Sequence, residues 1–253
     1  MCQINQAIQV LLDLFHRNGI HEQLDLAYSW YDRISGINYT EDGVNDLFSR
    51  YNNRIMKAIC DLDSLQKIIS EIFDWGIPNV GEATRACLAT RYSALLQKIH
   101  QESNEDNRVE CVIGRLGKDT PLSSWTKVLA AYDPNRFWIY DARVALALRF
   151  LSKYAALSYN GWYMPTPGSA YIEELAKAIN DGHLNTRRVK MRSSYQNYLE
   201  LLQMQEPDRG STTSNTNTAS HFEKMLFMLG GAIRDCYRNG NHATRDAIVS
   251  LDH

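Results

Sequence analysis

A lysine and an aspartate 14 positions apart are the residues of this chain best suited to do chemistry together. Lys127 lies at the end of segment 123–127, and Asp141 lies within segment 139–144. A lysine amine is a nucleophile only when it is neutral, and burial or nearby positive charge favours that form. A carboxylate such as that of Asp141 could stabilise positive charge that develops on a sugar as a base departs. The pair is therefore a candidate nucleophile with an electrostatic partner.

The elements that must position this pair are helices. Apolar residues recur at intervals of three and four along most of the chain, which is the period of a helix packed on one face. Strand-like alternation is almost absent, and no Asn-Gly or Asp-Gly hairpin signal separates two apolar runs. These patterns predict an all-α fold. The expected helices cover residues 4–15, 24–31, 44–59, 65–76, 79–100, 107–116, 123–132, 141–157, 169–181, 189–204 and 220–237.

Both candidate residues lie near helix starts. Ser123 or Ser124 is expected to cap the helix that carries Lys127, because a serine hydroxyl accepts hydrogen bonds from the first free backbone N–H groups. Asp141 is expected to cap the following helix in the same way. An alternative is that Lys127 and Asp141 form only a structural ion pair, or that Asp141 merely caps its helix and binds Arg143.

Composition limits the class of protein. A chain of 253 residues with 44% hydrophobic content can bury a core without disulfides. The cysteines show no CxxC spacing and the histidines no metal-ligand spacing, so we expect no cofactor and no metal. No apolar run approaches the roughly 20 residues that span a bilayer, which predicts a cytoplasmic protein with no membrane partner. Segment 205–219 is low in complexity and predicts a mobile loop.

The charge balance restricts nucleic-acid binding to a local surface. A net charge of −2 and a pI near 6.4 argue against avid, indiscriminate binding, which depends on clustered Lys and Arg. The candidate basic face, for which the alternative is a solvated helix start, comprises Arg187, Arg188, Lys190 and Arg192. Phosphate-binding and dinucleotide-binding glycine patterns and the Gly-x-Ser-x-Gly elbow are absent, which excludes kinase, dehydrogenase and hydrolase interpretations.

Aromatic residues supply candidate stacking surfaces for an extruded base. Trp162 and Tyr163 lie in an aromatic, proline-bearing loop and are the better candidates, whereas the alternative for Trp125 is a position in the core. Arg143 could contact a phosphate or a carboxylate of a partner, although a surface ion pair is the commoner outcome for such a residue.

The order of these residues resembles the helix-hairpin-helix DNA glycosylase superfamily, and within it the 8-oxoguanine DNA glycosylase-like proteins. The resemblance covers roughly residues 75–200 and rests on Lys127, which opens a helix, and on segment 139–144, which supplies an aspartate one helix later. It implies that Lys127 attacks the sugar C1′ and forms a Schiff base, while Asp141 stabilises the oxocarbenium-like transition state. The target base would be flipped into a pocket.

The resemblance also implies an organisation and a set of partners. It implies one two-lobed glycosylase-like domain over 1–253, with lobes formed by 1–75 with 200–253 and by 76–199, and a cleft between the lobes. The implied substrate is DNA carrying an oxidised purine such as 8-oxoguanine. Trp125, Arg143, Trp162 and Tyr163 would bind the substrate, and the basic face would contact the DNA backbone.

Two alternatives remain open. Segment 77–85 can be read as the family's Leu-Pro-x-Val-Gly hairpin, with Ala83 where the lysine should stand, or as a helix-capping turn that uses Gly81 and Thr84. Similar glycosylase-like chains accompany bacterial antiphage signalling genes. The chain could therefore be an inactive glycosylase-fold module that binds a nucleotide or a protein partner in a defence complex.

Overall fold

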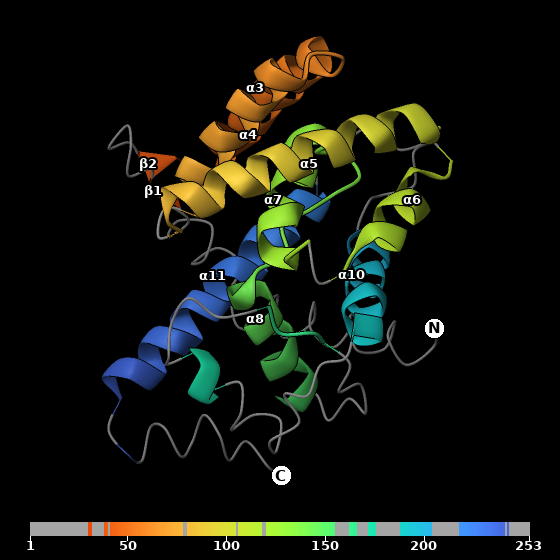
Figure 1. Cartoon of the computed structure of the whole chain (residues 1–253). Coiled ribbons are helices and arrows are strands. Elements are labelled where there is room, and N and C mark those ends of the chain that lie inside the picture. Colours follow the sequence, from red (N-terminus) through yellow and green to blue (C-terminus); the bar gives the residue numbers. More distant parts are fainter. Residues whose placement is uncertain are drawn as a thin grey trace. The chain divides into compact units, whose positions relative to one another are not determined.

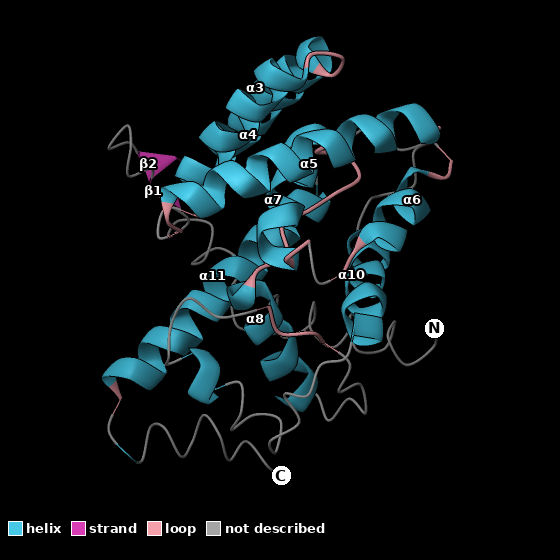
Figure 2. Cartoon of the chain, viewed as in Figure 1, coloured by secondary structure: helices cyan, strands magenta, loops and turns pink. Residues whose placement is uncertain are grey.

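Helices form most of the described chain, which confirms the all-α fold class (Figure 1, Figure 2). A computed structural model describes residues 30–31, 38–39, 41–77, 80–104, 106–117, 120–154, 162–165, 172–175, 188–203, 218–240 and 242. The long helices of the described residues begin and end within a few residues of the predicted ranges. Among the described residues, no helix has both the length and the apolarity needed to span a membrane.

The described residues form two compact units. The first unit belongs to Ser29–Ile139, and the second contains the described residues from Tyr140 onward. The predicted lobes, 1–75 with 200–253 and 76–199, stay a prediction. The first unit contains α3 (Glu41–Ala58), α4 (Leu62–Gly76), α5 (Glu82–Glu102), α6 (Arg108–Arg115) and α7 (Leu122–Tyr132), and the second contains α8 (Ala142–Tyr154), α10 (Arg188–Gln203) and α11 (Thr218–Asn239).

Three predicted segments differ from the structure or lie outside the described residues. The helix predicted over 24–31 is wrong at its end, because Trp30–Tyr31 forms strand β1 and pairs antiparallel with β2, Asn38–Tyr39. Aromatic residues favour strands, and pairing with β2 satisfies their backbone. The helix predicted over 4–15 lies outside the described residues. So does the mobile loop predicted over 205–219, apart from its last two residues, which begin α11.

The first unit is built around apolar faces of α3, α4, α5 and α7. Figure 1 shows α3 and α4 side by side, and α4 also packs against α5 and α7. Phe73 of α4, Tyr92 of α5 and Trp125 of α7 form a chain of ring contacts, with centroid separations of 5.7 Å and 4.8 Å. Aromatic contacts of this kind add to the stabilisation from buried area. They hold three helices together.

The described residues between α4 and α5 are Ile77, Val80 and Gly81. Gly81 occupies the N-cap position of α5, and its carbonyl accepts a hydrogen bond from the backbone N–H of Arg85. The guanidinium of Arg85 also forms an ion pair with Asp74 of α4. Gly81 therefore lies at a helix cap, as the capping-turn interpretation of segment 77–85 expects, and the hairpin interpretation stays a prediction.

Helix α7 is the most deeply buried helix of the first unit. Every one of its residues except Ser123 is buried. It begins at Leu122, directly after Pro121, and no side chain caps it. The prediction of a serine cap is wrong, because the helix starts before both serines. The Ser124 hydroxyl instead donates to the Pro121 carbonyl at 3.0 Å and lies 2.8 Å from the hydroxyl of Tyr92.

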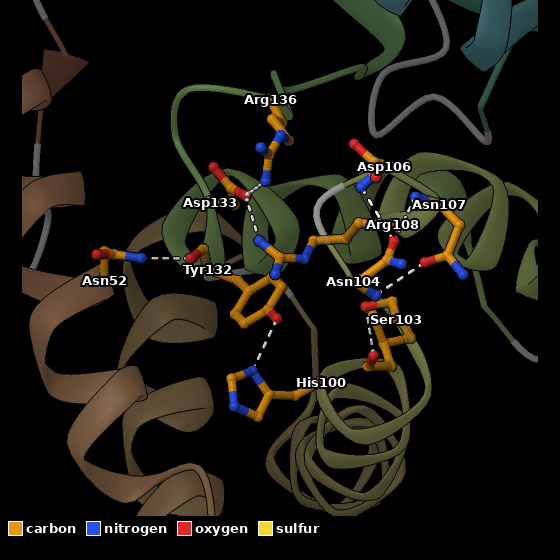
Figure 3. A network of polar contacts seen from close by, with 11 residues as sticks. Asn52, His100, Ser103, Asn104, Asp106, Asn107, Arg108, Tyr132, Asp133 and Arg136 are labelled. Carbon is orange, nitrogen blue, oxygen red and sulfur yellow. Dashed lines mark hydrogen bonds and ion pairs between the residues drawn. The ribbon is translucent and has the colours of Figure 1, made fainter.

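Polar contacts anchor the C-terminal end of α7 to its neighbours (Figure 3). The side-chain amide of Asn52, on α3, donates to the backbone carbonyl of Tyr132. The Tyr132 hydroxyl lies 3.1 Å from Nδ1 of His100 on α5. Burial raises the pKa of Tyr132, so this hydroxyl keeps its proton at neutral pH. Tyr132 thus connects α3 and α5 to the end of α7.

Asp133 completes this network immediately after the helix (Figure 3). Its Oδ2 accepts hydrogen bonds from Arg108 of α6 at 3.0 Å and from Arg136 at 3.2 Å. The Arg108 guanidinium also lies 5.7 Å from the centroid of the Tyr132 ring. The side chains of Arg108 and Asp133 are only 18% and 14% exposed, so the surrounding water screens their interaction weakly. One carboxylate therefore balances two guanidinium groups.

We predict that Asp133→Asn lowers the free energy of unfolding by about 1–3 kcal/mol, because it leaves two partly buried guanidinium groups without their carboxylate. The matched control is Glu71→Gln, which removes the carboxylate of the Arg54–Glu71 pair, whose side chains are each 47% exposed. This control is expected to cost less than about 1 kcal/mol. Urea unfolding of both variants measures the difference. Equal losses would show that the Asp133 network does not anchor α7.

Candidate functional site

Lys127 is a buried lysine held by its own helix. Its side chain is 3% exposed, and Nζ donates to the backbone carbonyl of Ser123 at 3.0 Å and to the Ser123 Oγ at 3.1 Å. Residues four positions apart share one face of a helix, so the lysine folds back along α7 onto the preceding turn. Both hydrogen bonds orient the amine. A charged group in such a position would be costly without them.

The end of α4 makes room for this lysine. Gly76 is the last residue of α4, and a Cβ placed on it would lie 2.6 Å from Cδ of Lys127. The aliphatic part of the Lys127 side chain therefore packs directly against the backbone of Gly76. The sequence pattern identified Gly76 only as a helix stop, and nothing in the sequence near it indicates contact with a residue about fifty positions later. Gly76 is thus a positioning residue for Lys127 that the sequence analysis missed.

Asp141 caps α8, as predicted. Its Oδ1 accepts hydrogen bonds from the backbone N–H groups of Arg143 at 2.9 Å and of Val144 at 3.1 Å. Its Oδ2 accepts no hydrogen bond from any residue that the structure describes. The carboxylate is half-buried, so the second oxygen is available to positive charge. The alternative in which the Asp141 and Arg143 side chains form an ion pair is not observed between these two described residues.

Arg143 is the second residue of α8 and packs against α11. Its guanidinium carbon lies 4.4 Å above the centroid of the Phe227 ring. Burial is the main cause that lowers the pKa of Arg143, and positive Arg234 acts in the same direction. The carboxylates of Asp141 and Asp235 partly oppose these effects.

The predicted stacking residues are more buried than a binding loop requires. Trp125 is fully buried in the core of the first unit, which bears out the alternative of a core position. Trp162 is 6% exposed, and its carbonyl accepts two hydrogen bonds from Arg149. Tyr163 is half-buried, and its backbone N–H donates to the Ser194 hydroxyl at 2.7 Å. Of the three, Tyr163 has the most surface left for a ligand.

The predicted basic face is described only in part. Arg187 lies outside the described residues, and the side chains of Arg188 and Lys190 are not described. Arg192, on α10, is exposed. DNA-backbone contact by this face stays a prediction.

Lys127 belongs to the first unit and Asp141 to the second. The boundary at Ile139 and Tyr140 falls inside the segment 139–144 that supported the resemblance. The contacts of Lys127 and of Asp141 given above therefore lie within their own units. The shared cleft that was expected for the pair stays a prediction.

A close contact between α8 and α11 supports the end of α8 that carries Asp141. A Cβ on Gly230 of α11 would lie 2.1 Å from the backbone oxygen of Arg143. Only glycine permits this approach, since the obstructing atoms belong to backbone rather than to a flexible side chain. The sequence placed Gly230 inside a predicted helix without any sign of this role.

We predict that Gly230→Ala lowers the free energy of unfolding by about 1–3 kcal/mol, because the added methyl overlaps the backbone of α8. The adjacent Gly231→Ala is the control, since a Cβ there meets no atom within 4 Å. It is expected to be neutral or to stabilise α11 by up to about 1 kcal/mol through helix propensity. Thermal and urea unfolding test both. A similar response from the two alanines would contradict the close contact.

No family model, curated protein or solved structure matches this chain.

Proposed function

We propose that the protein is a DNA N-glycosylase with lyase activity that removes an oxidised purine such as 8-oxoguanine, with Lys127 as nucleophile and Asp141 as electrostatic stabiliser. The observation that carries the proposal is the near-complete burial of Lys127 on α7. A buried ionisable group is unfavourable for folding, and such groups concentrate at functional sites. The two-lobed glycosylase fold and its cleft belong to this proposal.

The proposed reaction uses each group for one step. The neutral amine of Lys127 forms a bond to C1′ while the bond from C1′ to the base breaks, and the base leaves with the proton that the attacking nitrogen loses. Opening of the sugar ring then converts the carbinolamine-type adduct to a Schiff base. Positive charge develops on the sugar during the first step. The carboxylate oxygen of Asp141 that does not cap α8 would stabilise that charge. The Ser123 hydroxyl, 3.1 Å from Nζ, orients the amine.

We predict that borohydride crosslinks the wild-type protein to a duplex with 8-oxoguanine opposite cytosine, and that Lys127→Gln abolishes the crosslink. Borohydride reduces the Schiff base to a stable amine, so the trapped species reports the bond to the lysine. Lys67→Gln is the control, because Lys67 is exposed on α4 of the same unit. An undamaged duplex should give no crosslink. A crosslink that survives in Lys127→Gln would remove Lys127 from the proposal, and no crosslink with no base release would remove the activity.

We also predict that Asp141→Asn lowers the rate of base release by about 100-fold or more, because it removes the negative charge that faces the developing cation. Asparagine remains a good helix cap, so the free energy of unfolding should change by only a few tenths of a kcal/mol. Asp141→Ala removes both the charge and the cap, and is expected to cost about 1 kcal/mol as well. Single-turnover base release and urea unfolding separate the two effects. An active Asp141→Asn protein would leave Asp141 as a cap only.

A binding module without excision is the second candidate function. The net charge of −2 favours it, since strong binding of a DNA duplex depends on clustered positive charge. Its ligand would be a nucleotide, or a protein partner in a bacterial antiphage defence complex. The same two variants distinguish the candidates, because tight binding that Lys127→Gln and Asp141→Asn leave unchanged, without base release, belongs to the binding module.

A further inference from the structure

Arg143 combines partial burial with unused hydrogen-bonding capacity. Its side chain is half-buried and its guanidinium stacks on Phe227 at 4.4 Å. No residue that the structure describes accepts a hydrogen bond from this guanidinium or forms an ion pair with it. An arginine presents five N–H donors in a planar fork, and stacking on a ring leaves the edge of that fork open. The edge of Arg143 is therefore available to an acceptor from outside the chain.

The described charged side chains near Arg143 do not accept hydrogen bonds from its guanidinium. Arg234 on α11 already pairs with Asp235, through Nε to Oδ1 at 2.8 Å and Nη2 to Oδ2 at 2.9 Å. Asp141 uses one oxygen to cap α8. Burial of the Arg143 guanidinium lowers its pKa, and the carboxylates of Asp141 and Asp235 only partly offset that effect. Binding of an anion would neutralise the partly desolvated positive charge of Arg143.

We propose that Arg143, whose guanidinium lies over the Phe227 ring, forms a binding site for the phosphate group of a nucleotide or of a polynucleotide backbone. A guanidinium edge matches two phosphate oxygens and can donate to both, which a lysine ammonium cannot do in the same geometry. The Phe227 ring covers one side of the guanidinium, with its centroid 4.4 Å from the guanidinium carbon. The close approach of Gly230 to the Arg143 backbone fixes where α11 presents that ring.

The inference extends the proposed function by giving Arg143 a ligand. It does not need base excision, because phosphate binding can be measured on an unmodified nucleotide. The phosphate site and the glycosylase activity can therefore fail separately.

The test is calorimetric titration of the full chain at low salt with three probes: thymidine, thymidine 5′-monophosphate and a single-stranded oligothymidylate. Thymidine lacks only the phosphate of the mononucleotide, so the difference between them isolates the phosphate contact. We expect the wild type to bind a phosphate-bearing probe and not thymidine. Binding of the mononucleotide identifies a free nucleotide as a ligand, whereas binding of the oligothymidylate alone identifies a polynucleotide backbone.

Arg143→Gln should weaken binding of the phosphate-bearing probe by about tenfold or more, since it removes a charged hydrogen-bond donor. Arg143→Lys retains the charge and should still weaken binding, because the bidentate geometry is lost. Arg238→Gln is the matched control, since Arg238 is exposed on the same helix, and should bind as the wild type does. Unfolding curves establish that each variant is folded.

Three results would overturn the inference. The first is absence of binding to either phosphate-bearing probe. The second is equal affinity of the wild type for thymidine and for thymidine 5′-monophosphate. The third is an affinity of folded Arg143→Lys or Arg143→Gln equal to that of Arg238→Gln. If Arg143→Gln fails to fold, two measurements still test the inference. They are the affinity of Arg143→Lys and the wild-type affinities for thymidine and for thymidine 5′-monophosphate.

Discussion

The first unit depends on partners for the hydroxyl and amine groups of α7 inside an apolar environment. This helix is buried along nearly its whole length, yet it carries Ser124, Thr126 and Lys127. Each finds a partner close by: Ser124 contacts the Tyr92 hydroxyl, and both Thr126 and Lys127 donate to the Ser123 carbonyl, at 3.4 Å and 3.0 Å. A buried polar group without a partner would cost more than most single contacts contribute. The turn at Ser123 is thus the point on which the burial of α7 rests.

Close approach of backbone is the second requirement, and it recurs in both units. Gly76 allows the stem of Lys127 to cross the end of α4, and Gly230 allows α11 to touch the start of α8. In each case the absent side chain brings another element close to a residue singled out for its chemistry. The two contacts differ in tolerance. The lysine stem can move aside from an added methyl, whereas the backbone of α8 cannot without disturbing the cap at Asp141.

The sequence predicted what depends on local pattern and missed what depends on distant contacts. The periodicity of apolar residues located α3 to α8, α10 and α11, because each helix buries one continuous face. The cap at Asp141 was also predictable, since it involves only the next three residues. The serine cap of α7 was wrong because Pro121 starts the helix earlier than the serines suggest. The roles of Gly76 and Gly230 follow from packing partners far away in the chain, which no local pattern encodes.

Lys127 and Arg143 illustrate two different ways in which a basic residue is accommodated. The amine of Lys127 is enclosed and hydrogen-bonded within its own helix, an arrangement that serves either an activated nucleophile or a purely structural lysine. The guanidinium of Arg143 is stacked but its donors are left open within the described chain. Satisfied donors give no information about a ligand, whereas unsatisfied donors at a half-buried site require one, either water or an anion. Arg143 therefore carries the argument for ligand binding, whereas the contacts of Lys127 by themselves fit both of its roles.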